Sequence, residues 1–360
     1  MLDDSTDDTS ARADAVAAEL RAAGADIEHV RRTDRSGFKA GACAHGLTLS
    51  DAPFVAMIDA DFRPPSGWLK RVVPLMVKDD RAGFVQSRCE FENFQRNWLT
   101  RAQGLVQDGH YLVEQRSRAH AGWLFQFNGT GGVWRRQTIE QSGGWSDYSL
   151  CEDLDLTVRA ALADWRGIFV SEPPIPGQVP EGIRDFRRQQ RRWSNGFVQV
   201  AQKTIAPIWR GPWSLTRRVM AISLISHQIF FPAAAIGLIA LVLGSILHGS
   251  IAPYFGMLSL IAVMTTLVVL GITLPPYLTL KRGSVFDYFK TMASVPPLMI
   301  YLAFANGAKV LQTMRGRKST FKRTPKIDQE ASIDADVREA LTSAPTVTPA
   351  APALRSHPDQ

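Results

Sequence analysis

Two long uncharged stretches constrain this chain more than any other feature. No Asp, Glu, Lys or Arg occurs between Arg218 and His248, nor from Ile251 to Leu280. Each stretch exceeds the roughly 20 apolar residues that cross the hydrocarbon core of a bilayer. The mean hydropathy of the whole chain is nevertheless −0.07, so the remaining residues are strongly polar. The sequence therefore predicts a polar domain joined to an α-helical transmembrane domain.

The formal net charge is +7, and basic residues gather beside the apolar stretches, within residues 184–192 and again within 309–326. Positive charge in such places is typical of the cytoplasmic side of membrane proteins. We therefore predict a lipid bilayer as a partner and do not predict nucleic acid. The three cysteines are isolated, with no CxxC pair, which fits a reducing compartment.

Residues 1–180 alternate between helical and strand patterns. Helices are predicted over residues 11–23 and 68–76, and strands over residues 27–30, 54–58, 83–87 and 168–170. This alternation is typical of an α/β fold with a mainly parallel sheet. Ligands of such sheets bind beyond the carboxyl ends of the strands, and acidic residues of this chain follow strand ends.

The rest of the chain divides by composition. A Pro-rich connector at residues 173–180 leads into a long basic helix, and residues 181–217 are predicted as amphipathic interface helices. Residues 218–310 hold the transmembrane helices. The weaker apolar segment 291–308 contains Pro296-Pro297, and a full span there would place the next basic cluster outside. We therefore expect that segment to be re-entrant, interfacial or split. Residues 311–326 form a basic segment, and residues 327–360 are expected to be disordered.

An acidic pair directly follows the predicted strand 54–58. Asp59 and Asp61 are one residue apart, so the sheet would fix both carboxylates at one strand end. Mg²⁺ typically takes one or two protein carboxylates and completes its shell with water and phosphate oxygens. The pair predicts a divalent metal, Mg²⁺ or Mn²⁺, bridging to a diphosphate. Taken alone, a DxD is equally typical of a solvated acidic turn.

Two motifs near the N-terminus are weak on their own. Asp3 and Asp4 follow a short strand-like start, and Asp carboxylates there could accept hydrogen bonds from a nucleotide. The same residues are also typical caps of a following helix. Lys39 lies in a basic loop with two glycines, which suits phosphate but is common in other loops.

A Gly-rich turn and an acidic helix start provide further candidates. Asn128, Gly129 and Thr130 lie in the turn 127–132, which allows close approach of the backbone to a ligand. Asp153 could act as a general base for an acceptor hydroxyl, although the helix dipole also favours acids at this position. On the basic helix, Gln189, Arg192 and Trp193 fall on one face. That face suits a diphosphate and a stacked sugar, but also an interfacial anchor.

Taken in order, these motifs resemble the processive, membrane-embedded family-2 glycosyltransferases, which include the cellulose, hyaluronan and chitin synthases. The series comprises Asp3-Asp4, KAG at 39–41, DAD at 59–61, EDLDL at 152–156 and QQRRW at 189–193. The FNGTGG loop at 127–132 and FKRTPK at 321–326 make the likeness closest to the cellulose-synthase-like glucan and mannan synthases. The resemblance covers about residues 1–326.

The resemblance implies a Rossmann-like domain of the glycosyltransferase A type, facing the cytoplasm in a multi-pass protein of the cell (inner) membrane. Asp153 would then be the base, and Asp59 and Asp61 would hold the metal and the diphosphate. The other implied roles are nucleotide contact by Asp4 and Lys39, an acceptor loop of Asn128, Gly129 and Thr130, donor diphosphate and acceptor contact by Gln189, Arg192 and Trp193, and a gating-like segment with Phe321, Thr324 and Lys326.

The implied reaction is an inverting transfer of hexose from a nucleotide sugar to a growing β-glycan. UDP-glucose is favoured as donor and GDP-mannose is a close second. The alternatives are transfer to a membrane lipid, or an inactive membrane subunit that serves as a scaffold. The sequence does not identify an accessory subunit.

Three departures from the family pattern bear on these expectations. The family's first strand and helix should precede Asp3-Asp4, so we expect an N-terminally incomplete chain. Cys151 stands where Thr is common before Glu-Asp. The tail after Lys326 shows no further apolar span.

Overall fold

The computed structural model describes residues 1–250 and 252–316, which fall into two compact units that divide at Gly37. In the first unit, strand β1 (Leu2–Asp3), helix α1 (Thr9–Ala22) and strand β2 (Val30–Arg31) form a βαβ arrangement with parallel strands. The gating-like residues Phe321, Thr324 and Lys326 and the tail 327–360 lie outside the described residues.

The second unit contains a four-stranded mixed sheet in the order β3-β5-β4-β6. Strands β4 and β6 are parallel, whereas β5 is antiparallel to both β3 and β4. Three of the four strands therefore run in one direction, as predicted, and β5 runs against them between β3 and β4. The bounds are β3 (Phe54–Met57), β4 (Ala82–Phe91), β5 (Gly132–Arg135) and β6 (Arg166–Gly177).

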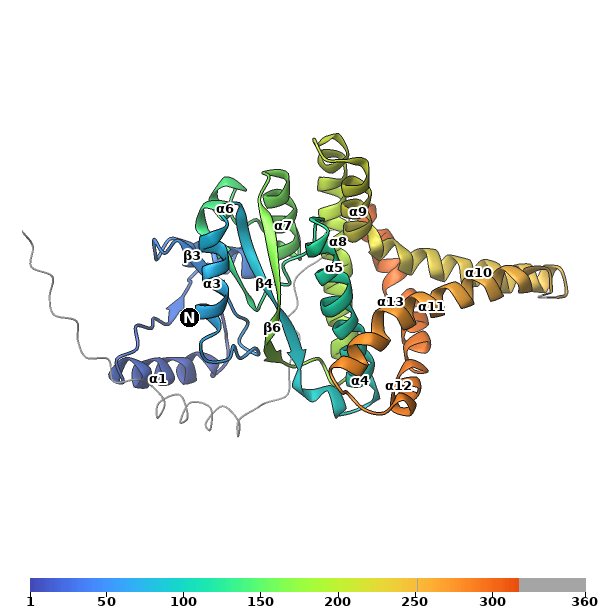
Figure 1. The fold of residues 1–360 in the computed structure, drawn as a ribbon, viewed down its shortest axis with the longest axis horizontal. Coiled ribbons are helices and arrows are strands. Elements are labelled where there is room, and N and C mark those ends of the chain that lie inside the picture. Colours follow the sequence, from blue (N-terminus) through green and yellow to red (C-terminus); the bar gives the residue numbers. More distant parts are fainter. Residues whose placement is uncertain (251, 317–360) are drawn as a thin grey trace, which may run out of the picture. The chain divides into compact units, whose positions relative to one another are not determined.

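Helices cover both faces of this sheet (Figure 1). Successive strand residues point to opposite faces, so Val85 packs with α3 (Trp68–Lys78) on one side, whereas Phe84 packs with α6 (Arg136–Gln141) and α7 (Glu152–Leu162) on the other. On the second face the side chain of Trp134 of β5 is completely buried, at 0% exposure. This layered α/β/α arrangement agrees with the predicted class.

Two local expectations were wrong. The strand predicted over 54–58 is a half-buried edge strand, not a buried parallel one, because its ladder is formed with the reversed β5. The Pro-rich connector predicted at 173–180 is strand as far as Gly177. Proline is tolerated in β6 because β6 is the opposite edge strand, where a missing N–H need not break a ladder.

The remaining described helices surround and extend the sheet. They are α2 (Phe38–Leu47), η1 (Glu92–Gln95), α4 (Trp98–Gly109), the π-helical turn η2 (His110–Gln115), α5 (Arg116–His120), α8 (Ile183–Arg210), α9 (Leu215–Ser226), η3 (His227–Ile229), α10 (Phe230–Leu247), η4 (Ala252–Tyr254), α11 (Phe255–Thr279), α12 (Val285–Met292) and α13 (Val295–Met314).

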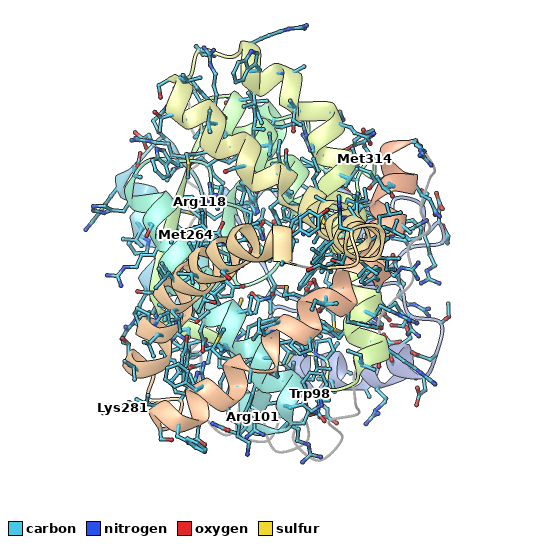
Figure 2. The ribbon with its side chains drawn as sticks, turned by 90° about the vertical axis from the view of Figure 1, so that its right-hand side faces the viewer. Trp98, Arg101, Arg118, Met264, Lys281 and Met314 are labelled. Carbon is cyan, nitrogen blue, oxygen red and sulfur yellow. The ribbon has the colours of Figure 1, made fainter. Side chains whose placement is uncertain are left out.

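Two helical segments, Leu215–Leu247 and Leu258–Thr279, are long and apolar enough to cross a membrane. Helices α10 and α11 extend away from the sheet (Figure 1). Their side chains are largely exposed, as at Met264, which is labelled in Figure 2 and is 50% exposed. A soluble core helix would instead bury such residues. In the segment 291–308, one helix ends at Met292 and the next begins at Val295, so the chain divides just before the two prolines.

A buried ion pair joins the end of α11 to α4. Arg282 donates from Nε and Nη2 to the two carboxylate oxygens of Asp108 at 2.9 and 3.1 Å, and its guanidinium lies over the Phe94 ring. Asp108 is only 1% exposed, and burial raises its pKa above the usual range despite the nearby arginine. The pair ties the apolar helices to the polar part of this unit.

We expect Arg282→Leu to destabilise the protein by about 3–5 kcal/mol, because it leaves the Asp108 carboxylate buried without its cation. The midpoint of thermal unfolding in detergent measures this loss. Arg96→Leu is the control, since Arg96 pairs with Glu181 but is 69% exposed, and it should cost no more than about 1 kcal/mol. Equal midpoints for the two variants would contradict the expectation.

Candidate active site

The reversed strand β5 determines where the Gly-rich turn lies. Gly132 at the start of β5 pairs with Met57 at the end of β3 and with Gln86 of β4. The residues that lead into β5 therefore lie at the carboxyl end of β3, beside the second half of β4. This edge is also where Asp59 leaves β3, so the turn and the DxD motif share one edge of the sheet.

Lys39 connects several parts of this edge. It lies in the first turn of α2, and its Nζ donates to Asp59 Oδ1 at 2.5 Å and to the Gly129 carbonyl at 2.9 Å. Glu152 Oε1 lies 3.9 Å from the same nitrogen. Burial would lower the pKa of Lys39, but the charges of Asp59 and Glu152 outweigh burial and raise it above the usual value.

The Gly-rich turn is held by hydrogen bonds from both neighbouring strands. The Asp59 N–H donates to Thr130 Oγ1 at 2.9 Å, and the Asn128 N–H donates to Gln86 Oε1 at 2.8 Å. Gln86 Nε2 in turn donates to the Thr130 carbonyl at 3.0 Å. The sequence analysis missed Gln86, although a polar side chain within the apolar strand pattern 83–87 was a signal that it has a specific partner.

Asp153 lies in the first turn of helix α7, and its carboxylate lies beside the Gly-rich turn. Its Oδ1 accepts the Leu154 N–H at 2.8 Å, and a methyl group on Gly129 would lie 2.9 Å from its Oδ2. Burial and the charge of Glu152 raise the pKa of Asp153 to about 7, against the opposing charges of Lys39 and Arg192. A carboxylate with such a pKa is suited to accept a proton near neutral pH.

The helix that carries QQRRW is docked directly on the start of α7. A methyl group on Gly196 would lie 2.3 Å from Cys151 Sγ, so only glycine allows this approach. Cys151 donates to the Trp193 carbonyl at 3.8 Å, and Ser149 Oγ donates to the Gly196 carbonyl at 3.0 Å. The thiol thus occupies the contact between the two helices. The sequence analysis missed Gly196.

The predicted face of α8 is consistent with this docking. Gln189, Arg192 and Trp193 lie within the unbroken helix α8 and are half-buried. The charge of Arg192 lowers the pKa of Asp153, so its guanidinium lies near the candidate base. Trp193 packs beside the core formed by α7, α8 and α9.

The carboxylates fit a metal that is shared with a ligand. Asp59 and Asp61 flank the turn after β3, and among the described residues no group of three or more His, Cys, Asp or Glu gathers in one place. Two carboxylates form too small a donor set for a protein-only site, but they match a cation whose other ligands are phosphate oxygens and water.

Asp4 belongs to the first compact unit, residues 1–36. It is paired with Arg32, whereas Asp3 is buried and accepts from Ser10 Oγ at 2.6 Å and from the Ser5 N–H at 2.8 Å. These bonds hold the pKa of Asp3 well below its usual range in spite of burial. The nucleotide role of Asp4 stays a prediction.

The family described as "Glycosyl transferase family group 2" matches residues 54–278, the part that contains the sheet, Asp153 and the QQRRW helix. The chain belongs to this family. The prediction of a cellulose-synthase-like family-2 glycosyltransferase is confirmed, and the site just described is the candidate active site of this glycosyltransferase.

Two proteins and one solved structure are similar to this chain. "Probable glucomannan 4-beta-mannosyltransferase 6" of Oryza sativa subsp. japonica is 40% identical over 183 residues, which are 50% of this chain and 32% of that protein. "Glucomannan 4-beta-mannosyltransferase 1" of Cyamopsis tetragonoloba is 38% identical over 183 residues, 50% of this chain and 35% of that protein. The chain thus spans about a third of the length of these relatives.

The solved structure of the mannosyltransferase PcManGT from Pyrobaculum calidifontis, in complex with GDP-Man and Mn2+, shares the fold of this glycosyltransferase. The TM-score is 0.57 at 19% identity, with 86% of this chain and 75% of that chain covered. The predicted glycosyltransferase A-type α/β fold is therefore confirmed.

We expect Glu152→Gln to shift the acid limb of the pH–rate profile to lower pH. Glu152 raises the pKa of Asp153, and a base must be deprotonated to accept a proton, so removing this charge extends activity toward acid. Initial rates of sugar transfer between pH 5 and 9 measure the shift. Glu140→Gln, on the exposed Glu140–Arg136 pair, should leave the limb near pH 7. If the acid limb of the profile does not move in the Glu152 variant, a group other than Asp153 is responsible for that limb.

Gly129→Ala should lower transfer by roughly 100-fold, because displacement of reacting groups by about 1 Å can cost this much. The added methyl would press on Asp153 and Lys39. Gly122→Ala is the matched control, since Gly122 also has a positive φ of 67° but open space around it. Both variants should lose about 1 kcal/mol of stability, and equal transfer rates in both would contradict the role of the close contact.

Proposed function

We propose that this chain catalyses inverting transfer of mannose from GDP-mannose to a growing β-linked glycan. The observation that carries the proposal is the Asp153 carboxylate, with its pKa of about 7, pressed against Gly129 beside the Lys39–Asp59 pair. A proton acceptor here stands next to groups suited to a sugar diphosphate.

In the proposed reaction, Asp153 accepts the proton of an acceptor hydroxyl while that oxygen attacks the anomeric carbon of the donor. A carbon–oxygen bond forms on one side of the sugar as the bond to the diphosphate breaks on the other, so an α-linked donor gives a β-linked product. Arg192 would stabilise the departing diphosphate, and Gln189 and Trp193 would hold the acceptor on the same face of α8.

Asp59 and Asp61 would hold Mg²⁺ or Mn²⁺, which when bound neutralises charge on the diphosphate. In the structure, the Lys39 ammonium donates to one of the two carboxylate oxygens of Asp59, Oδ1. Asn128, Gly129 and Thr130 would form the acceptor side of the site, and Asp4 and Lys39 would contact the nucleotide.

The choice of donor rests on the relatives, two of which are named as glucomannan 4-beta-mannosyltransferases, and on the GDP-Man complex of the fold neighbour. This reverses the order predicted from the sequence, in which UDP-glucose came first. The two apolar segments support a further proposal, that they anchor the enzyme in the cell membrane with the catalytic domain in the cytoplasm.

Membranes that contain the full chain should transfer labelled mannose from GDP-mannose, with Mg²⁺ or Mn²⁺, into a polymer that β-mannanase digests. UDP-glucose should give much less product. Asp153→Asn should abolish transfer while leaving GDP-mannose binding intact, whereas Asp164→Asn should have no effect, because Asp164 is an exposed residue beyond the far end of α7.

Each other outcome has a definite meaning. Label only in a chloroform-soluble product would show transfer to a membrane lipid and would end the polymerase proposal. Absence of transfer from either donor would support the inactive-subunit alternative. Normal transfer by the Asp153 variant would show that the base has been misassigned.

A further inference from the structure

A π-helical turn separates α4 from α5 and brings together three polar side chains. In a π turn residues five apart come into line, and such turns occur frequently at functional sites. His110 uses both ring nitrogens here. Nδ1 lies 2.9 Å from Glu114 Oε2, four residues on, and Nε2 lies 3.0 Å from Gln115 Nε2, five residues on. A regular α-helix would not align both partners.

Gln115 joins this turn to the Gly-rich loop. It is 1% exposed, and its amide nitrogen lies 3.0 Å from Asn128 Oδ1 and 3.3 Å from the Gln126 carbonyl. Because the Gln126 carbonyl can only accept, the amide nitrogen of Gln115 faces it. The same nitrogen then donates to His110 Nε2, and the proton of the neutral ring is on Nδ1, facing Glu114.

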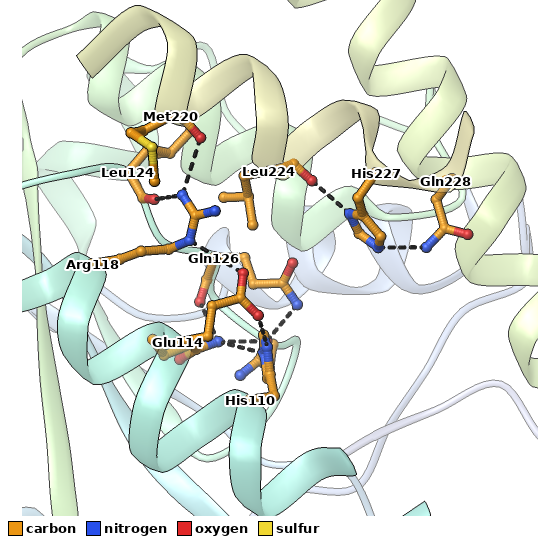
Figure 3. A network of polar contacts seen from close by, with 11 residues as sticks. His110, Glu114, Arg118, Leu124, Gln126, Met220, Leu224, His227 and Gln228 are labelled. Carbon is orange, nitrogen blue, oxygen red and sulfur yellow. Dashed lines mark hydrogen bonds and ion pairs between the residues drawn. The ribbon is translucent and has the colours of Figure 1, made fainter. Parts of the chain in front are cut away.

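Glu114 is the common partner of this network (Figure 3). Arg118 Nε donates to its second oxygen at 3.2 Å, and Arg118 Nη1 donates to the Met220 carbonyl of α9 at 3.0 Å. Burial would raise the pKa of Glu114, but the hydrogen bond from His110 and the charge of Arg118 lower it to about 2. The carboxylate is therefore charged under all ordinary conditions.

The far end of the network reaches the transfer site. Asn128, whose side chain Gln115 holds, precedes Gly129, and Gly129 gives its carbonyl to Lys39 and lies against Asp153. A substitution of Glu114 would thus alter the surroundings of the candidate base through His110, Gln115 and the loop. No contact between Glu114 and a substrate is required.

We propose that Glu114 is a positioning residue for sugar transfer, which fixes the Gly-rich loop through His110 and Gln115 and anchors it to α9 through Arg118. The proposal deepens the proposed function and rests on it for its kinetic test. Its structural test, by amide hydrogen exchange, does not depend on activity.

Glu114→Gln should speed amide exchange in peptides that cover residues 126–132, measured by mass spectrometry on the full chain in detergent. The affected amides include that of Asn128, which donates to Gln86, and that of Gly131, which donates to the Met57 carbonyl. Glu140→Gln is the matched control, because Glu140, which is 54% exposed against 39% for Glu114, also pairs with an arginine four residues away but lies in α6 and not in the π turn. Unchanged exchange in the loop, or equally faster exchange throughout the protein, would overturn the proposal.

The kinetic test compares Glu114→Gln, Asn128→Ala and the double variant. Glu114→Gln should reduce the rate of transfer by roughly 10- to 100-fold, with an unchanged dissociation constant for GDP-mannose and partial recovery in Glu114→Asp. Because both residues act through the same set of contacts, the double variant should be at most about twofold slower than Asn128→Ala.

Multiplication of the two single effects, or loss of donor binding in Glu114→Gln, would refute the positioning role. If the unaltered chain transfers no sugar, the proposed function fails and the exchange measurement alone decides the role of Glu114.

Discussion

One ammonium group, that of Lys39, holds the transfer site together. Its three oxygen partners, on Asp59, Gly129 and Glu152, come from the end of β3, the loop before β5 and the start of α7. Carboxylates brought this close would repel one another without a cation between them. The position of helix α2 therefore determines whether the DxD motif, the Gly-rich loop and the candidate base can lie in one place.

The site motifs were recognisable from sequence because each is a run of unusual polar residues, and the structure brings Lys39, Asp59, Gly129 and Asp153 together. What periodicity does not reveal is the reversal of β5. Gly132–Arg135 contains only two apolar residues, Val133 and Trp134, between a glycine and an arginine, which is too little for a strand pattern. Yet this reversal places the loop before β5 at the carboxyl end of β3. A purely parallel β5 would have put its leading loop at the other end of the sheet.

The roles of other residues could not be assigned from sequence because they depend on contacts between distant segments. Gly196 matters only because Cys151 approaches it from the start of α7, and Gln86 only because Asn128 lies opposite. The wrongly predicted connector at 173–180 has a related cause, since proline content reports local preference, whereas edge position in the sheet decides whether a strand tolerates it. The motifs could not decide between UDP-glucose and GDP-mannose, because they address the diphosphate and not the base or the sugar.

The π turn at His110–Gln115 also sets the number of residues that this part of the chain requires. Each residue advances an α-helix by about 100°, and the turn contains one residue more than a regular helix would need. Loss of a single residue here would restore a straight helix and rotate everything from Arg116 onward, so that Arg118 would no longer face Met220. A one-residue deletion would therefore separate the Gly-rich loop from its anchor on α9.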